Sequence, residues 1–302
     1  MSEKIIDIKE LTKDYGHGRG VFDASISVEA GECYGFLGPN GAGKTTTIRH
    51  LMGFSKPDSG STSINGMDSW QNAAQLKQDI GYLPGEIALP AGLTGRGFLK
   101  MTLKMHGCKD ERFCRQLLER FALDPDKKTR EMSLGEKRKL AIVAAFMHDP
   151  QILILDEPTS GLDPVMQQEF IEFVREEKQR GKTIFLSSHI FHEVDAVCDR
   201  IAIIKTGKIV SEFKADELKE TQDSIYAISF SDKSSYEKFC SRGYTLTADS
   251  EERLKVKVRV PMTDLNRFVA DMSQLDIKSF HQIPFSLEDY FMDFYKSEEV
   301  QG

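Results

Sequence analysis

A glycine-rich loop near the N-terminus has the sequence of a phosphate-binding loop. It matches the pattern G-x-x-x-x-G-K-[ST] and lies after an apolar run and before a helical one, as such a loop must. Glycines let backbone N–H groups curve around phosphates, and the following helix adds its dipole. We expect Lys44 to reach the β- and γ-phosphates of ATP and the Thr45 hydroxyl to bind Mg²⁺. The expected nucleotide-binding residues of this loop are Gly38, Pro39, Asn40, Gly41, Ala42, Gly43, Lys44, Thr45 and Thr46.

Two carboxylates directly follow an apolar run in the second half of the chain. Ile152–Leu155 is apolar throughout, and Asp156 and Glu157 come next. Ligands bind at the carboxyl ends of strands in open α/β sheets, so we expect Asp156 to hold Mg²⁺ and Glu157 to polarise the attacking water. Each motif alone has an ordinary alternative, a glycine-rich turn or a strand that happens to end in acids. Together they predict a nucleotide-hydrolysing site.

A parallel sheet is needed to bring these residues together. Four short runs are too apolar to face water, which is typical of a sheet covered on both sides. A helix is expected over Lys44–Met52 and a crossover helix over Glu169–Arg180. Short alternating runs near the N-terminus, Ile5–Ile8 and Ala24–Val28, favour further strands. The four apolar runs are Cys33–Leu37, Ile152–Leu155, Thr183–Ser187 and Ile201–Ile204.

Two regions have a different character. The stretch from about residue 89 to 150 is rich in helical patterns and predicts a helical subdomain. Beyond about residue 219 the pattern predicts a separate small α/β domain, so we divide the chain into 1–219 and 220–302. In Arg253–Val260 the apolar side chains alternate with basic ones, and the basic face is either solvated or a binding surface. A last helix opening at Ser286 places its aromatic residues at helical spacing, and we expect it to dock on a core.

The composition narrows the function classes. The 302 residues include 47 acidic and 40 basic side chains, a net charge of −7, which argues against a general nucleic-acid binder. Five scattered cysteines include no Cys-x-x-Cys pair, so neither a disulfide framework nor a zinc site is supported. No signal core opens the chain, and no apolar stretch approaches the roughly 18 residues that a membrane helix needs. We therefore expect a cytoplasmic protein whose membrane role would come through a partner.

Four shorter motifs carry a resemblance to the ABC ATPase family. Met132-Ser-Leu-Gly-Glu136 resembles its signature, usually Leu-Ser-Gly-Gly-Gln, and stands a short helix before the Asp156–Glu157 strand. Ser160-Gly-Leu-Asp163 resembles the D-loop, and His189 resembles the switch histidine. Tyr15 resembles the aromatic residue that stacks on adenine. The match keeps the family's order from Ile5 to about Val210.

Each of these motifs also has an ordinary alternative. Ser133 with Glu136 is a capping box and could simply begin a helix. A single histidine is usually a core or surface residue, and Tyr15 could fill a turn. The resemblance implies instead that Ser133 and Gly135 contact the γ-phosphate of an ATP bound to a second subunit. It also implies that His189 contacts the γ-phosphate and that Asp163 belongs to the catalytic set.

Two motifs depart from the family pattern, and the signature also has Glu136 where glutamine is usual. Leu134 stands where the signature usually has its first glycine, which resembles the exporter subgroup with ABC-2 type membrane domains, as does the tail sequence Phe285-Ser-Leu-Glu-Asp-Tyr-Phe. In Ile80-Gly-Tyr-Leu-Pro-Gly-Glu86 the slot of the usual Mg²⁺-sensing glutamine, the Q-loop, is Gly85. Our hypothesis is that Glu86 replaces that glutamine, because a carboxylate is a hard, charged Mg²⁺ ligand. The alternative is a solvated loop acid.

The resemblance implies a RecA-like P-loop NTPase core with an N-terminal antiparallel β subdomain and a helical subdomain, plus the C-terminal accessory domain. It implies an ATP-hydrolysing subunit that dimerises head-to-tail, as a homo- or heterodimer, and drives the membrane-spanning permease of an exporter from the cytoplasmic face. We expect the permease to dock near Phe98–Met105, through Phe98, Leu99, Met101 and Leu103. The alternatives are a soluble ABC protein acting on ribosomes or DNA, and an inactive regulatory subunit. The sequence has one cassette, no heptad run and all the expected catalytic residues, which argues against both alternatives.

Overall fold

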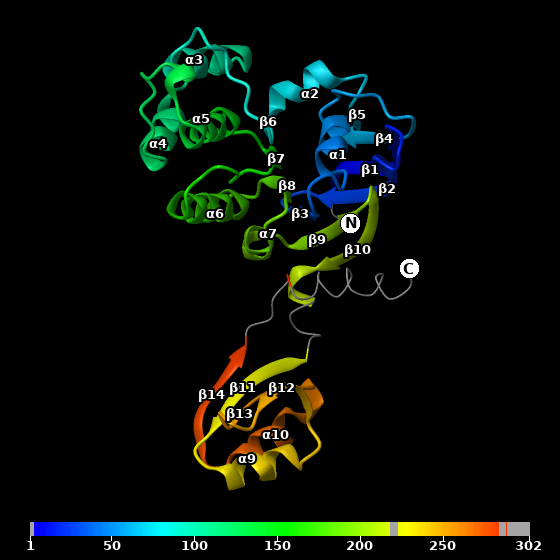
Figure 1. Ribbon diagram of the computed structural model, residues 1–302. Helices are drawn as coiled ribbons and strands as arrows, with labels where there is room; N and C mark the ends of the chain where they lie inside the picture. Colours follow the sequence, from blue (N-terminus) through cyan, green and yellow to red (C-terminus); the bar gives the residue numbers. More distant parts are fainter. Residues whose placement is uncertain (1–2, 218–222, 284–287, 289–302) are drawn as a thin grey trace. The chain divides into compact units, whose positions relative to one another are not determined.

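The computed structural model describes residues 3–217, 223–283 and 288 (Figure 1). The chain divides into two compact units, residues 1–215 and 216–302. Each unit has its own core and is described by itself. Within the described residues, no helix has both the length and the apolar character needed to cross a membrane.

The first unit opens with an antiparallel sheet whose strand order is β2-β1-β4-β5. Alternate residues of β1 and β2 are buried, so one face of the sheet lies on the core and the other is solvated. This is the expected antiparallel β subdomain. Its strands are β1 (Lys4–Asp14), β2 (Gly20–Glu29), β4 (Ser59–Ile64) and β5 (Met67–Asp68).

A six-stranded sheet with the order β10-β9-β3-β8-β7-β6 forms the centre of the first unit. All its pairs are parallel except the β9–β10 hairpin. Every residue of β3, β7 and β8 is buried, as the apolar runs predicted. Because these strands are parallel, the loops that follow them emerge at one edge and bring the chemical residues together. The strands are β3 (Cys33–Leu37), β6 (Ile80–Leu83), β7 (Ile152–Asp156), β8 (Thr183–Ser188), β9 (Arg200–Lys205) and β10 (Lys208–Lys214).

Helices cover this sheet and build the helical subdomain, in which α3 and α4 both contact α5 (Figure 1). The expected RecA-like architecture with its two subdomains is confirmed. The predicted crossover helix at Glu169 begins earlier, at Pro164, because Asp163 caps its first turn and proline is favoured there. The helices are α1 (Lys44–Leu51), α2 (Ala73–Asp79), α3 (Gly95–Met105), α4 (Arg112–Arg120), η1 (Thr129–Glu131), α5 (Leu134–Phe146), α6 (Pro164–Gln179) and α7 (Phe191–Val197).

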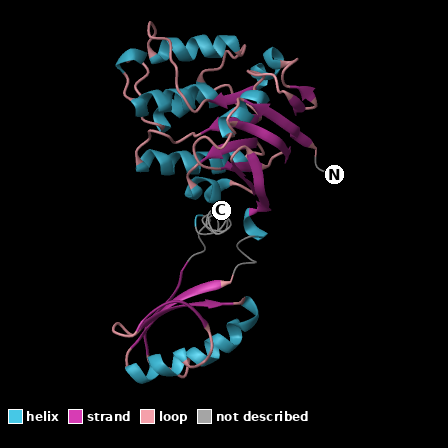
Figure 2. Ribbon diagram, turned by 45° about the vertical axis from the view of Figure 1, so that its right-hand side comes forward, coloured by secondary structure: helices cyan, strands magenta, loops and turns pink. Residues whose placement is uncertain are grey.

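The second unit is an antiparallel sheet of order β12-β13-β11-β14, with the described helices α9 and α10 on one face (Figure 2). The valines of β13 are buried against those helices, while its lysines and arginine are exposed. The strand starts at Lys255 rather than Arg253, since Leu254 has a φ of 50°. The predicted helix from Ser286 lies outside the described residues apart from Glu288. The elements are β11 (Ser224–Phe230), α9 (Lys233–Cys240), β12 (Thr245–Ser250), β13 (Lys255–Val260), η2 (Met262–Asp264), α10 (Leu265–Met272) and β14 (Ile277–Ile283).

Candidate nucleotide site

The glycine-rich loop connects β3 to α1 with a backbone that only glycine adopts easily. Gly41 and Gly43 have φ values of 81° and 112°. A Cβ added at Gly38 would lie 2.4 Å from the Ile204 carbonyl oxygen, so this position has no room for a side chain. Gly43 is the N-cap of α1 and provides no side-chain cap. The first-turn N–H groups of α1 therefore have no cap of their own, which suits an anion such as phosphate.

Lys44 is held at the base of this loop. Its Nζ donates to the carbonyl oxygens of Gly38 at 2.6 Å and Pro39 at 3.2 Å. It also lies 3.0 Å from Glu157 Oε1, and its side chain is only 5% exposed. The buried ammonium is thus placed in the loop with a carboxylate beside it.

Asp156 ends β7 beneath the loop and accepts from two hydroxyls. Thr45 Oγ1 donates to Asp156 Oδ2 at 2.9 Å, and Ser187 Oγ of the neighbouring strand β8 donates to Oδ1 at 2.5 Å. Burial raises the pKa of Asp156, while the bonds from Ser187 and Thr45 act in the opposite direction. The predicted pair of oxygen donors for a metal, one hydroxyl and one carboxylate, is therefore in contact.

Glu157 and His189 meet at the same edge of the sheet. Glu157 has a φ of 48°, in the left-handed region, which is costly for a glutamate and is often found at functional sites. His189 Nδ1 lies 2.5 Å from Glu157 Oε2. Glu157 Oε1 is close to Lys44 by distance, yet the angles do not make this contact a hydrogen bond, so Oε1 has no hydrogen-bond partner among the described residues.

No hydrogen bond or ion pair among the described residues joins the remaining predicted residues to this centre. Tyr15 is 50% exposed in the turn between β1 and β2. Ser133 caps α5 in a complete capping box with Glu136, and Asp163 caps α6 by accepting from Met166 N at 3.0 Å. Glu86 is exposed. Among the described residues, no hydrogen bond or ion pair joins Ser133, Gly135 or Asp163 to the phosphate-binding loop.

Comparison with known proteins gives the family. Residues 21–160 match the family model described as ABC transporter. Over 95% of this chain and 96% of the other, the sequence is 35% identical to the bacitracin transport ATP-binding protein of Bacillus licheniformis. The chain belongs to the ABC transporter ATP-binding proteins. It is an ATP-binding and ATP-hydrolysing subunit of an ABC transporter.

Further relatives agree with this assignment. A Nod factor export ATP-binding protein of Burkholderia orbicola is 37% identical over 74% of this chain and 75% of the other. A solved ATP-binding subunit of an ABC transporter superposes with a TM-score of 0.67 at 31% identity, covering 72% of this chain and 92% of that one. A dimeric bacterial ABC transporter cassette superposes with a TM-score of 0.64 at 22% identity, over 70% and 99%, and shares the fold.

Sequence reasoning missed two buried charges of this ABC site, Arg138 and Glu193. Glu193 is 3% exposed at the start of α7. It accepts hydrogen bonds from Thr159, which precedes the D-loop, and from Ser188, which precedes the switch histidine, the latter at 2.8 Å. An acid four residues after His189 could have been noted in the sequence, but its burial depends on how α7 packs.

The environment of Glu193 leads to a prediction about pH. Burial raises the pKa of Glu193 from 4.5 to about 7, and the charge of Glu157 adds to the rise. The pKa of Glu193 is higher in the folded state than in the unfolded state. The contribution of the protonated carboxyl to the free energy of unfolding is therefore complete below about pH 4.5 and is lost as the pH rises through about 7. Glu193→Gln, which cannot ionise, should unfold at nearly the parent temperature at low pH. It should be more stable than the parent by about 1–3 kcal/mol near pH 8.

Thermal unfolding followed by circular dichroism across this pH range tests the prediction. Glu172→Gln, a change at an exposed acid on α6, is the matched control and should show no pH-dependent difference. A constant offset between Glu193→Gln and the parent at all pH values would contradict the prediction.

Proposed function

We propose that this subunit powers an exporter, with Lys44, Asp156, Glu157 and His189 as the hydrolytic centre of each chain. The observation that carries the proposal is their convergence beside the uncapped N-terminus of α1. The name of one relative, a Nod factor export ATP-binding protein, supports the export direction. A soluble ribosome- or DNA-acting ABC protein is the alternative, and no feature of this site favours it.

In this proposal Glu157 is the general base. Its Oε1 is paired with Lys44 in this structure and would take the water's proton once Lys44 turns to the phosphates, while His189 holds Oε2 and so orients the carboxylate. Lys44 lies 3.0 Å from the same carboxylate and within reach of the loop that would surround the phosphates. Water attacks the γ-phosphorus, its proton passes to Glu157, and ADP leaves as the γ-phosphate bond breaks. The buried setting strengthens each of these electrostatic contacts.

The donors at this centre suit Mg²⁺. Asp156 and Thr45 present hard oxygen atoms, and Mg²⁺ in nucleotide sites takes few protein ligands and completes its shell with phosphate oxygens and water. When bound, the ion would neutralise developing charge on the phosphates.

We further propose that Ser133 and Gly135 complete the site of a second subunit. The capping box gives α5 an ordered N-terminus whose N–H groups and Ser133 hydroxyl could face a γ-phosphate. A bond between Lys127 and Glu136 holds the box together and, with the Ser133 N–H, lowers the pKa of Glu136 to about 2. Tyr15, exposed on its hairpin, is proposed to stack on adenine.

The replacement of the Q-loop glutamine by Glu86 is tested by Mg²⁺ titration. If Glu86 senses the metal, Glu86→Ala needs more Mg²⁺ for half-maximal ATP hydrolysis and Glu86→Gln partly restores the parent requirement, since an amide still offers an oxygen ligand. Glu111→Ala, at another exposed acid of the first unit, is the control. Both Glu86 variants matching the parent would rule out the replacement.

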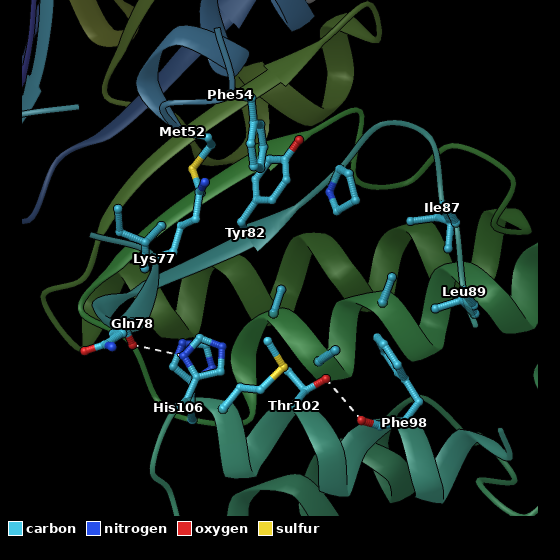
Figure 3. A pocket seen from close by; sticks show the side chains of 18 of the residues that line it. Met52, Phe54, Lys77, Gln78, Tyr82, Ile87, Leu89, Phe98, Thr102 and His106 are labelled. Atoms are coloured by element: carbon cyan, nitrogen blue, oxygen red, sulfur yellow. Dashed lines mark hydrogen bonds between the residues drawn. The ribbon is translucent and has the colours of Figure 1, made fainter. Parts of the chain in front are cut away.

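The proposed permease would dock in a groove between α2, α3 and α5, with a volume of about 490 Å³ (Figure 3). The expectation for α3 needs correction: Leu99 and Leu103 are buried in the subdomain core, at 2% and 4% exposure, and so are unavailable. Met101 is exposed outside the groove. The residues of α3 that line the groove are Phe98, Thr102 and Met105, and His106, which caps the end of α3, lines it as well.

The groove has an apolar end and a polar end with one lysine, and both ends limit which partner can bind. Ile87, Leu89 and Phe98 lie together at one end, and Lys77, Gln78 and His106 at the other (Figure 3). None of the described lining residues is Asp or Glu. A permease segment with apolar side chains and an acidic group is the proposed occupant, which would hold the subunit on the cytoplasmic face of the membrane.

Membrane association tests the docking proposal. Phe98→Glu should reduce recovery of the subunit with membranes that contain its coexpressed permease, because the new charge enters an apolar groove. ATP hydrolysis by the isolated subunit should persist. Met101→Glu, on the same helix but outside the groove, is the matched control. Membrane recovery of Phe98→Glu equal to that of the control would count against this groove.

A further inference from the structure

Arg138 is a buried cation whose hydrogen bonds all go to backbone carbonyls. It lies on α5, five residues after the Ser133 cap, and is 3% exposed. Its Nε donates to the Ser160 carbonyl oxygen at 2.9 Å, Nη1 to that of Pro84 at 2.9 Å and Nη2 to that of Gly85 at 2.6 Å. Among the described residues, no carboxylate hydrogen-bonds to this guanidinium.

Burying a cation without a hydrogen-bonded carboxylate costs free energy, which indicates that the position of this guanidinium matters. Burial lowers the pKa of Arg138. The charges of Asp156 and Glu157, which form no hydrogen bond with the guanidinium, partly offset that effect. Arginine nevertheless remains protonated, so its planar set of N–H donors keeps a fixed geometry. The carbonyls on both sides are therefore held at fixed positions relative to each other.

The bonded carbonyls belong to two different loops. Pro84 and Gly85 follow β6, while Ser160 follows β7, and these strands are parallel neighbours that pair Leu83 with Leu155. Both loops emerge at the edge of the sheet where the nucleotide site lies. Arg138 is the side chain that bridges them from α5.

The loop after β6 packs against the hydrolytic centre, and the D-loop is joined to it by the Ser160 N–H, which donates to the Glu157 carbonyl oxygen at 3.2 Å. A Cβ added at Gly85 would lie only 3.1 Å from Asp156 Oδ2, so the loop after β6 lies directly against the proposed metal ligand. On the other side, a Cβ added at Gly161 would lie 3.0 Å from the Leu134 side chain, so the D-loop packs on the signature segment. A shift of either loop would change the surroundings of the reacting groups.

The same elements form the groove. Pro84 lines it, and Ala141, Ala144 and Ala145 of α5 form part of its wall beyond Arg138. We propose that Arg138 is a positioning residue that couples the loop at the groove to the D-loop. A glutamine at position 85 would connect this loop to the catalytic centre through its side chain, which Gly85 lacks. Arg138 would make the connection through backbone carbonyls instead. The inference rests on the hydrolytic centre proposed above.

Kinetics of two variants test the positioning role. Arg138→Gln retains one amide group and cannot bond both loops, and Arg138→Lys retains the charge without the planar geometry. Both should lower kcat for ATP hydrolysis by about 10- to 100-fold with little change in KM for ATP, because misplaced catalytic groups act on the transition state. Arg120→Gln, which removes a partly buried arginine paired with Glu169 and Glu176, controls for loss of stability. Unchanged kcat in both Arg138 variants, or an equal fall in the control, would overturn the proposal.

Hydrogen exchange of the D-loop tests the coupling itself. The N–H groups of Ser160 and Leu162 donate to Glu157 and Thr159 and report how well this turn is held. Pro84→Gly loosens the loop after β6. Introduced into the parent, it should speed hydrogen exchange at both amides, whereas introduced into Arg138→Gln it should cause no further increase. No effect in the parent, or an equal effect in both backgrounds, would mean that Arg138 does not connect the loops. ATP turnover of the unmodified chain, measured in the kinetic experiment, separates this failure from a failure of the proposed active centre.

Discussion

Lys44→Ala is expected to abolish ATP hydrolysis and weaken ATP binding. The Lys44 ammonium is the cation that the phosphate-binding loop itself supplies, and its Nζ is already positioned by the Gly38 and Pro39 carbonyls. Removing it leaves the negative charge of the β- and γ-phosphates without that partner and leaves Glu157 without its neighbouring cation. A phosphate-release assay, together with nucleotide titration, measures both effects.

Arg49→Ala is the matched control for this change. Arg49 is also a cation on α1 but its side chain is exposed, so its loss should leave turnover close to that of the parent. Both variants should fold, as judged by their circular dichroism. Unchanged phosphate release by Lys44→Ala would refute the assignment of this loop.

The parts of the fold and site that could be predicted are those encoded in contiguous segments. The loop at Gly38 can be recognised because its glycines and Lys44 must follow one another to surround a phosphate. The strands β3, β7 and β8 could be predicted because a sheet covered on both faces needs unbroken apolar runs. Parallel pairing of those strands then explains why Asp156 and Glu157 lie beside Lys44.

Features that depend on packing between distant segments could not be predicted. In the sequence Arg138 is one of several charges near the start of a helix, and only the folded chain shows that it is buried between two loops. Glu193 appears in the sequence as an ordinary helix acid. For α3, helical spacing identifies two faces but does not say which one meets the core, and Leu99 and Leu103 were therefore wrongly assigned to the docking surface.

Position 85, where the family usually has the Q-loop glutamine, shows that the sequence does not reveal backbone contacts. The sequence shows Gly85 where a side chain was expected, and it suggests the neighbour Glu86 as a replacement. The structure adds a different physical reason for the glycine, because a Cβ there would crowd Asp156. It also shows that the carbonyls of Pro84 and Gly85 accept hydrogen bonds from Arg138. Every residue has a backbone carbonyl, so residue types do not indicate such bonds.

Glu157→Gln is expected to bind ATP normally but to hydrolyse it about 10²–10⁴-fold more slowly, the usual contribution of a positioned base. The amide has nearly the shape of the carboxylate and can still contact His189, yet it cannot take the proton of the attacking water. Glu157 Oε1, which has no hydrogen-bond partner among the described residues, is the atom whose basicity is lost. Single-turnover hydrolysis and nucleotide binding, measured side by side, separate the chemical step from affinity.

The same variant should reveal the head-to-tail dimer. If Ser133 and Gly135 of one chain face the ATP of another, slow hydrolysis leaves both nucleotides in place and the closed pair accumulates. Light scattering should then give twice the chain mass of 34.1 kDa with Mg-ATP and the monomer mass with Mg-ADP. A second variant, Glu157→Gln with Ser133→Arg, places a bulky cation at the capping residue of α5 and should remain monomeric in Mg-ATP. Monomer alone for Glu157→Gln at saturating Mg-ATP would mean that either the sandwich arrangement or the pairing of identical chains is wrong.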